Sequence, residues 1–336
     1  MSDIHMTLEE VGEIAQAALE GAGASAQNAA SVARSTMKAE RDGIRSHGLL
    51  YVPIYAEHVA CGKVDGMAKP VVERSRPGAI RVDAASGFAH PAIDAGWQAL
   101  SEAARENGVA AMTIYNSYNC GVLGHHAERL AQDGLLGLCF THAPASIAPA
   151  GGRKPVVGTN PFSIAVPDGN GDALIVIDQS ASVIAKSEIL LRSRTGIPIE
   201  PNWALDPDGN PTTDAKIALK GSMAPSGGYK GFGIGLLVEI MAACLSGSVL
   251  SKDASPFSGT AGGPPKTGQC FMAFDTSAFT GSTFSQQVLD LAGAITDQDG
   301  CRLPGSRRQD NRKTIEREGV SLDAELHDRI RQYIKN

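Results

Sequence analysis

Apolar residues near the N-terminus recur with the spacing of an α-helix. Thr7 and Glu10 stand three residues apart, the spacing of a capping box, in which two side chains satisfy backbone N–H groups at a helix start. Val11 begins an apolar series of helical period. Gly21 and Gly23 predict where that helix ends, because glycine readily adopts the left-handed backbone of a helix C-terminus.

The pattern changes from helical to alternating beyond about Lys63. Residues 80–83 alternate between apolar and charged side chains, as a half-buried strand does. Residues 193–226 and 255–268 are rich in Pro and Gly, and we expect long loops there, the first of them functional. The remaining predicted elements are helices over 25–40, 90–107, 124–132 and 230–245, strands over 109–115, 135–141, 162–166, 174–178 and 269–275, and a helical tail from Phe284.

This order of elements predicts an α+β fold with helices contributed by both ends of the chain. We expect a helical part formed by residues 1–75 and 300–336, and an α/β part formed by residues 76–299. Strands and helices do not alternate regularly, as they would in a doubly wound sheet. The GxGxxA string at residues 21–26 follows a helix and not a strand, so it predicts a helix end and not a dinucleotide-binding turn.

Composition excludes several classes of protein. The 336-residue chain has a net charge of −6 and no long basic run, so we expect no nucleic acid as a partner. No apolar stretch is long enough to span a bilayer, and the N-terminus lacks the plan of a signal peptide, so we expect no membrane partner. Six cysteines occur without a CxxC pair, which indicates reduced thiols and a cytoplasmic location.

The segment RDGIRSHGLLYVPIY, residues 41–55, contains the first candidate for chemistry. Asp42-Gly43 predicts a turn, and the apolar residues after Gly48 predict the buried side of a helix. His47 would then lie at a turn-to-helix junction, where its side chain can reach a cleft. Histidine is the usual proton donor near neutral pH. The alternative is a histidine that only caps the helix.

Three further strings contain polar groups at expected turns. Asp178 ends the apolar run LIVID, where a carboxylate can accept a hydrogen bond from an imidazole or simply cap the strand. The turn GTNP, residues 158–161, offers short polar side chains held by a proline, or is purely structural. The glycines of GGYKG, residues 227–231, let a backbone approach a phosphate near Lys230, or form a flexible helix entry.

The order of SHG, GTNP, GYKG and LPGSRR along this chain resembles the type-2 malate/L-lactate dehydrogenase family from about Thr7 to the C-terminus. That family also contains sulfolactate and ureidoglycolate dehydrogenases and reductases of cyclic imino acids such as Δ1-piperideine-2-carboxylate. The resemblance implies an NAD(P)-dependent oxidoreductase whose cofactor binds a non-Rossmann, largely antiparallel sheet. It also implies a homodimer, and places cofactor and substrate on residues 76–299.

The resemblance assigns roles to individual residues. His47 would be the proton donor, supported by Ser46 and Asp178, and Thr159 would contact the substrate. In one direction a hydride would pass from NAD(P)H to C2 of a small 2-oxo acid of the malate, lactate or sulfolactate type. The alternatives are a Δ1-piperideine- or Δ1-pyrroline-2-carboxylate reductase and a non-catalytic ligand-binding relative. The implied cofactor contacts are Asn119, Cys120, Gly121, Tyr229, Lys230, Pro304, Gly305, Arg307 and Arg308.

Two positions depart from the family pattern. Tyr51 stands where the family usually has an arginine that pairs with the substrate carboxylate. We expect Tyr51 to contact the substrate, but a tyrosine carries no positive charge at pH 7, so Arg45 and Arg194 are candidates to bind the carboxylate in place of that arginine. Asn119 stands where many members have histidine, and its amide can still donate and accept hydrogen bonds. The adjacent arginines near residue 308 favour NADP slightly over NAD, because they can bind an extra phosphate.

The pair His125-His126 raises the question of a metal site. Adjacent residues on a helix point about 100° apart, so both imidazoles cannot easily face one ion. No HExxH string or similar ligand set accompanies them. The sequence therefore predicts no metal site.

Overall fold

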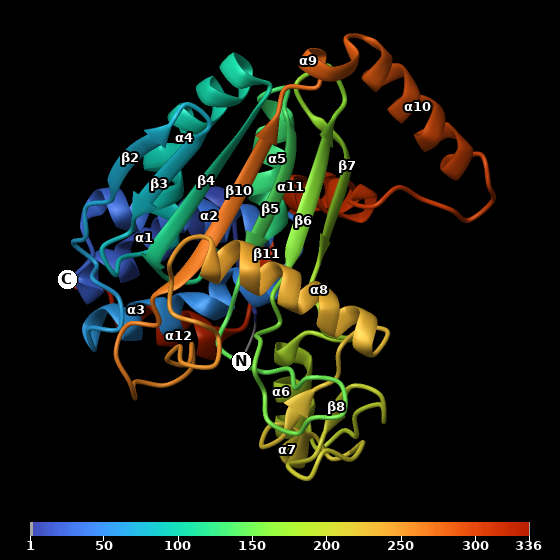
Figure 1. Cartoon of the computed structure of the whole chain (residues 1–336). Helices are drawn as coiled ribbons and strands as arrows, with labels where there is room; N and C mark the ends of the chain where they lie inside the picture. Colours follow the sequence, from blue (N-terminus) through green and yellow to red (C-terminus); the bar gives the residue numbers. More distant parts are fainter. Residues whose placement is uncertain (1–2, 336) are drawn as a thin grey trace.

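The computed structural model describes residues 3–335. The two ends of the chain are joined in a small sheet, because β1 (Ile4–Met6) pairs antiparallel with β11 (Val320–Leu322). Helices from both ends pack around this sheet and share one apolar cluster (Figure 1). These helices are α1 (Leu8–Ala22), α2 (Ala26–Arg41), α3 (Val52–Ala60), α11 (Ser306–Glu318) and α12 (Ala324–Arg331). The division of the chain into two domains stays a prediction.

The body of the molecule is a sheet of seven strands in the order β2-β3-β4-β10-β5-β6-β7 among the described residues. Neighbouring strands are antiparallel except β3 and β4, which are parallel. The expected α+β fold with a largely antiparallel sheet is therefore confirmed. The strands are β2 (Val71–Arg76), β3 (Ala79–Asp83), β4 (Val109–Ser117), β5 (Leu136–Thr141), β6 (Phe162–Pro167), β7 (Ala173–Gln179) and β10 (Thr267–Phe274).

Helices cover both faces of this sheet, because alternate strand residues point to opposite sides. Cys139 and Phe271 belong to the large apolar core under α4 (Ala89–Asn107) and α5 (Leu123–Gln132). Their neighbours Phe140 and Cys270 belong to a separate cluster with Val238. That second cluster packs under α8 (Tyr229–Glu239) and the π-helical turn Ile240–Cys244 that follows it (Figure 1).

The predicted N-terminal helix has the expected ends. Thr7 and Glu10 form both hydrogen bonds of the capping box. Gly23 caps α1 at its C-terminus with a φ of 115°, in the left-handed region. Gly21 does not end the helix, which continues to Ala22. Its missing side chain serves packing instead, since a Cβ there would collide with the Tyr333 backbone.

Residues 193–226 are not the long loop that their composition predicted. They continue α6 (Lys186–Thr195) and contain β8 (Ala204–Leu205), α7 (Ala215–Ala218) and β9 (Ser222–Met223). This small unit, at the bottom of Figure 1, has its own apolar core around Ile147, Ile189 and Met223. Elements of two to four residues are too short for a periodic signal, which is why the pattern concealed them.

The segment after Gly48 also differs from the prediction of one continuous helix. Leu49–Tyr51 is a 3₁₀ turn, and α3 begins at Val52, with Pro53 in its first turn. Leu50 is half exposed, whereas Leu49 and Val52 are fully buried. Within residues 3–335, no helix is long and apolar enough to cross a membrane.

Candidate active site

The Ser46–His47 pair lies in a 3₁₀ turn, Arg45–His47, at the end of α2. Ser46 Oγ is 3.0 Å from His47 Nδ1, and His47 is half-buried. Gly48 follows because Glu40 occupies the space that a Cβ would need. The buried Glu40 carboxylate accepts a hydrogen bond from the Leu49 amide at 2.7 Å. Glu40, on the preceding helix α2, thus fixes the turn that presents His47.

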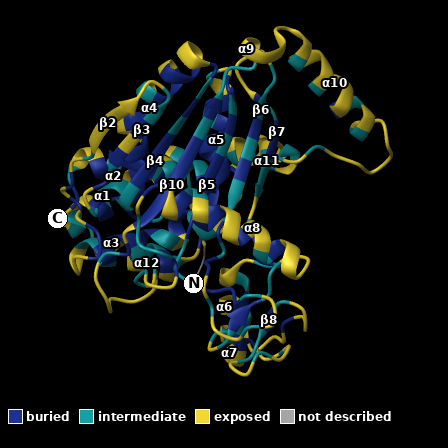
Figure 2. Cartoon of the chain, viewed as in Figure 1, coloured by how far each residue is buried: buried dark blue, intermediate teal, exposed yellow. Residues whose placement is uncertain are grey.

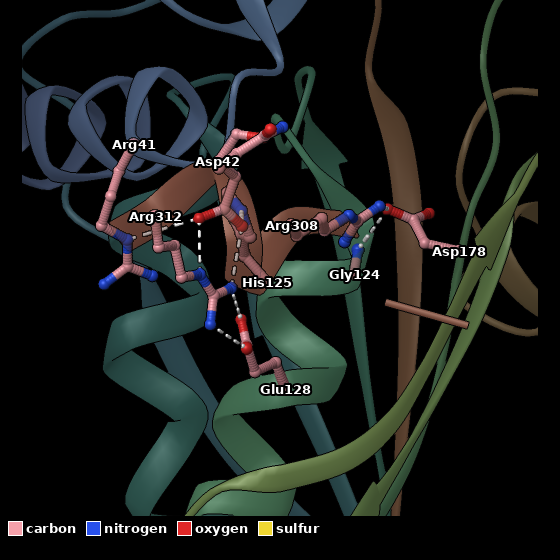
Figure 3. Close-up of polar contacts among 9 residues, drawn as sticks. Arg41, Asp42, Gly124, His125, Glu128, Asp178, Arg308 and Arg312 are labelled. Carbon is pink, nitrogen blue, oxygen red and sulfur yellow. Dashed lines mark hydrogen bonds and ion pairs between the residues drawn. The ribbon is translucent and has the colours of Figure 1, made fainter. Parts of the chain in front are cut away.

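Asp178 lies near the end of β7, at the N-terminus of α5. Its Oδ2 accepts a hydrogen bond from the Gly124 amide at 3.0 Å and pairs with Arg308 Nη2 at 2.6 Å (Figure 3). A carboxylate at a helix N-terminus is stabilised by the helix dipole and by free N–H groups. Gly124 is required here because a Cβ would stand 2.6 Å from Asp178 Oδ2.

The expected hydrogen bond between Asp178 and His47 is not formed among residues 3–335. Asp178 acts on His47 through its charge instead. Burial lowers the pKa of His47 below its ordinary value, the negative charge of Asp178 raises it, and the neighbouring His125 and the Arg308 cation lower it. The role of Asp178 as support for His47 stays a prediction, with electrostatics in place of a direct contact.

Arg308 therefore has a partner within the protein that its predicted role did not include. Its pairing with Asp178 leaves Nη1 buried without a hydrogen-bond partner in the described part of the chain. Arg307, by contrast, is exposed and forms no ion pair with any described residue. Of the two adjacent arginines, Arg307 has the freer guanidinium for a cofactor phosphate.

One helical turn beyond Arg308, Arg312 forms a different set of contacts (Figure 3). Its guanidinium binds both oxygens of Asp42 at 2.7 and 2.8 Å and both oxygens of Glu128 at 2.7 and 2.8 Å. His125 Nε2 is 3.0 Å from Asp42 Oδ2. The Asp42 side chain is fully buried, and hydrogen bonds from Arg312 and His125 hold its pKa well below the ordinary value.

The GTNP turn, residues 158–161, lies at the same end of the sheet as Asp178. The Thr159 carbonyl accepts a hydrogen bond from the Ala181 amide at 2.8 Å, three residues after Asp178. Asn160 is fully buried with a φ of 39°, and its side chain bonds the backbone of Ala143 and the Glu239 carboxylate. Asn160 is therefore structural, which leaves Thr159 as the polar side chain of this turn that can contact a ligand.

The predicted cofactor loop is only partly accessible. Asn119 Oδ1 accepts hydrogen bonds from the Gly121 amide at 2.7 Å and from the Tyr55 hydroxyl at 3.2 Å. Its amide N–H groups bond no other described residue. The Cys120 thiol is buried in the core, which raises its pKa to about 12. A cofactor could reach Cys120 only through its backbone, and the Cys120 carbonyl already bonds His126.

Tyr51 packs into an aromatic cluster. Its ring lies edge-on to Tyr55, with centroids 4.7 Å apart, and its hydroxyl lies close to Tyr118. Burial raises the pKa of Tyr51. Arg45, one candidate to replace the missing arginine, directs its guanidinium at the Ser321 carbonyl in β11. A substrate-binding role for Tyr51 stays a prediction, and packing already explains part of its environment.

Two further predicted cofactor segments lie at helix starts. Tyr229 and Lys230 are exposed in the first turn of α8, after Gly228, whose φ is 65°. Pro304 and Gly305 precede α11, and the Pro304 carbonyl accepts a hydrogen bond from the Val176 amide of β7 at 3.1 Å. Gly305 has a φ of 96°, which favours glycine. The two segments keep their predicted roles as predictions.

Several residues of this region escaped sequence reasoning. Glu40, Glu128 and Arg312 lie on helices where a charged residue ordinarily faces solvent, so no local pattern marked them. Gly124 was visible only as a helix residue. The two adjacent histidines His125 and His126 have different partners, the Asp42 carboxylate and the Cys120 carbonyl.

A family model described as malate/L-lactate dehydrogenase matches residues 6–331. The chain belongs to this family. It is 40% identical over 329 residues to a (2R)-3-sulfolactate dehydrogenase (NADP⁺) of Chromohalobacter salexigens, covering 98% of this chain and 97% of that protein. It is 37% identical to a Δ1-pyrroline-2-carboxylate reductase of Ancylobacter novellus, with 96% and 95% covered.

Solved structures agree with these sequence relatives. The Δ1-piperideine-2-carboxylate reductase of Pseudomonas syringae pv. tomato superposes with a TM-score of 0.92 at 31% identity, covering 98% of this chain and 99% of that one. A sulfolactate dehydrogenase of Methanocaldococcus jannaschii shares the fold, with a TM-score of 0.89 at 24% identity. The protein is an NAD(P)-dependent dehydrogenase or reductase of this family. The alternative of a non-catalytic relative is thereby set aside.

Proposed function

We propose that the protein transfers a hydride reversibly between NADP(H) and C2 of a small 2-hydroxy or 2-oxo acid, with His47 as the proton donor and acceptor. The observation that carries this proposal is the Ser46–His47 pair, half-buried and within the electrostatic reach of Asp178. The 40% identical relative named as an NADP⁺-dependent sulfolactate dehydrogenase supports both the substrate class and the cofactor.

The chain's residues fit a dinucleotide phosphate. Lys230 and Arg307 are exposed cations at or beside helix N-termini, and neither pairs with a described carboxylate. The Asn119 side-chain amide bonds no other described residue through its N–H groups and so keeps donors for a ligand. When bound, the cofactor supplies the hydride chemistry, and the protein orients the reactants and moves the proton.

His47 would protonate the oxygen that forms on C2 during reduction and take the proton back during oxidation. Ser46 would fix the orientation of the ring through Nδ1, which leaves Nε2 for the substrate. Because the His47 pKa lies below its ordinary value, the neutral form predominates at pH 7. The form of the enzyme that predominates at neutral pH is therefore the one that accepts a proton from the 2-hydroxy acid, and the reduction rate, which needs the protonated form, should fall as pH rises through the His47 pKa.

The relatives also support a second candidate, the reduction of a cyclic imine such as Δ1-pyrroline-2-carboxylate. The two reactions differ in their need for a proton. A 2-oxo acid becomes an alkoxide on hydride addition and needs a donor, whereas a protonated imine already carries its proton. His47→Ala should therefore lower 2-oxo acid reduction by roughly 10²–10⁴-fold, the usual worth of a general acid, and imine reduction by less.

The test is a steady-state screen of 2-oxo acids, including 3-sulfopyruvate, and cyclic imines with NADPH and NADH. Wild type, His47→Ala and the control His5→Ala, an exposed histidine at the N-terminus, would be compared. Unchanged 2-oxo acid turnover in His47→Ala would remove this residue from the mechanism. A clear preference for imines in the wild type would favour the second candidate.

The cofactor contacts have their own test. Arg307→Ala and Lys230→Ala should weaken NADPH binding more than substrate binding, because both are proposed to contact phosphate. Arg302→Ala, an exposed arginine just before the same segment, is the matched control. A titration of NADPH fluorescence measures each affinity. Loss of NADPH and NADH binding to the same extent in Arg307→Ala would contradict its assignment to the additional phosphate of NADP.

We propose further that the protein is a homodimer. The 14-residue helix α10 (Thr283–Thr296) projects from the body with Ala292 as its one buried residue in the described chain (Figure 2). Leu289 and Leu291 are at least half exposed on it, as are Ile240 and Leu245 after α8. A helix this short is marginal in water alone, so a second copy would stabilise it. Light scattering tests this: Leu291→Asp should yield monomers, and a monomeric wild type would refute it.

A further inference from the structure

A small polar pocket opens between α2, α4 and α5, beneath the predicted cofactor loop. It has about 60 Å³ of free space, where one water molecule needs roughly 10–15 Å³ on the same measure. Its lining is almost wholly polar: it contains Ser31, Arg34, Ser35, Lys38, His90, Asp94, His125, His126 and Arg129, with Ile93 as the apolar exception. None of these residues was assigned a role in hydride transfer.

The charges around the pocket are unbalanced. Arg34 and Arg129 both pair with Asp94, at 3.0 and 2.7 Å, so a single carboxylate serves two guanidinium groups. Lys38 forms no ion pair or hydrogen bond with another residue of the described chain. The other acid near Lys38 is Glu128, which is already held by Arg312. The pocket therefore presents more positive than negative charge, and Lys38 lacks a counter-ion.

His90 provides a second, independent observation. It is 4% exposed, lines the pocket, and neither ring nitrogen has a hydrogen-bond partner among residues 3–335. The nearby Cys120 carbonyl is bonded to His126 instead, at 2.9 Å. An imidazole always has at least one N–H to donate, and leaving it buried without an acceptor is unfavourable. A ligand with acceptor oxygens would satisfy it.

The pocket's side chains are held in place before any ligand arrives. The Arg129 guanidinium lies 4.0 Å from the centre of the Trp97 ring and is fixed by Asp94. Ser31 Oγ donates to Asp94 at 2.7 Å. Ser35 also lines the pocket; its Oγ lies near Gly121 and bonds no other described residue. Fixed cations and hydroxyl donors around a small space are the features of an oxyanion site.

We propose that this pocket binds a small tetrahedral oxyanion, such as inorganic phosphate or sulfate, between Lys38, His90 and Ser35. Lys38 supplies the unpaired charge, and His90 and Ser35 supply neutral donors. The space suits the free ion or the phosphate or sulfate group of a slim metabolite. The pocket borders Gly121 through Ser35 and His90, but none of its lining residues is a proposed cofactor contact, and the proposal does not depend on the proposed reaction.

The experiment is calorimetric titration of sodium phosphate into the full-length protein at constant ionic strength, without cofactor or substrate. Wild type should bind one phosphate per chain. Lys38→Met should weaken binding about tenfold or more, the equivalent of one charged hydrogen bond, while Lys69→Met, an exposed lysine elsewhere, should not. Equal affinity in wild type and Lys38→Met, or equal loss in Lys69→Met, would overturn the proposal.

His90→Leu guards against a purely structural explanation. The substitution removes a buried polar ring that has no partner, so the variant's melting temperature in phosphate-free buffer should be no lower than that of the wild type. Its affinity for phosphate should nevertheless be lower. Retained affinity in this variant would contradict the site. Saturating NADPH should leave phosphate binding intact; its loss would mean that phosphate occupied the cofactor's own phosphate site. Glycerol 3-phosphate in place of phosphate tells whether a phosphate ester or only the free ion enters.

Discussion

Arg308 and Arg312 lie one turn apart on α11, yet their surroundings differ. Arg312 has each of its terminal nitrogens bound to a carboxylate, between Asp42 and Glu128. Arg308 bonds one carboxylate, Asp178, and keeps a buried Nη1 without a partner in the described chain. Both arginines connect α11 to the rest of the protein (Figure 3). Arg312 is therefore complete as a structural contact, whereas Arg308 keeps a donor that a ligand could use.

The difference teaches how a structural ion network can be told from a site. A network that satisfies every donor and acceptor stabilises one arrangement and has nothing left to offer a ligand. An arginine that is satisfied only in part, beside a half-buried histidine whose pKa it lowers, is poised for chemistry. The two positions should therefore respond differently to the same substitution.

The largest expected effect is that of Arg312→Met. It leaves the buried Glu128 carboxylate without an ion-pair partner in the described chain and the buried Asp42 carboxylate with only Arg41 and His125, so the free energy of unfolding should fall by about 3–5 kcal/mol. Urea unfolding measures the loss. Arg317→Met, on the exposed side of α11, is the control and should cost less than about 1 kcal/mol. A loss of similar size in both variants would show that the network is not what holds α11.

Arg308→Met should cost less stability than Arg312→Met but change catalysis. Removing this cation raises the His47 pKa, whereas Asp178→Asn removes the charge that raises it and so lowers it further. The rate of 2-oxo acid reduction should therefore decline at a higher pH in Arg308→Met than in the wild type, and at a lower pH in Asp178→Asn. pH–rate profiles of kcat/KM decide, and shifts in the same direction would refute the electrostatic link.

The network around Arg312 should also set the protein's acid stability. Because the folded pKa of Asp42 is depressed, its contribution is fully present above the ordinary value of 3.8 and is lost as pH falls from there toward the folded pKa. Asp42→Asn should be less stable at pH 7 and lose less stability than the wild type between pH 4 and pH 2. Parallel stability curves for the two proteins would contradict this reasoning.

Tyr51→Phe has the smallest expected effect and tests which type of position Tyr51 is. Loss of a buried hydroxyl close to Tyr118 should lower the free energy of unfolding by no more than about 1.5 kcal/mol. If Tyr51 is purely structural, like Arg312, KM should stay unchanged. An increase in KM without a change in kcat would instead show that the hydroxyl binds substrate in the ground state.

Much of the fold was predictable because it follows from local pattern. The capping box at Thr7, the strands from β3 to β7 and the helices α4 and α5 occur within a few residues of their predicted positions. The errors concern short elements, such as β8, β9 and the 3₁₀ turn Leu49–Tyr51, in which too few residues repeat to show a period. In those places packing against distant residues decided the backbone.

The sequence by itself determined the helix ends, the strand pattern, the turn that presents His47 and the family. Only the tertiary structure decided the partners of the charged groups. It brought Arg308 to Asp178 and Arg312 to Asp42, across 130 and 270 residues of chain. It also gathered Lys38 and His90 around one pocket. Local pattern reports backbone preference and burial over a few residues, whereas an ion pair depends on distances between segments that the sequence does not encode locally.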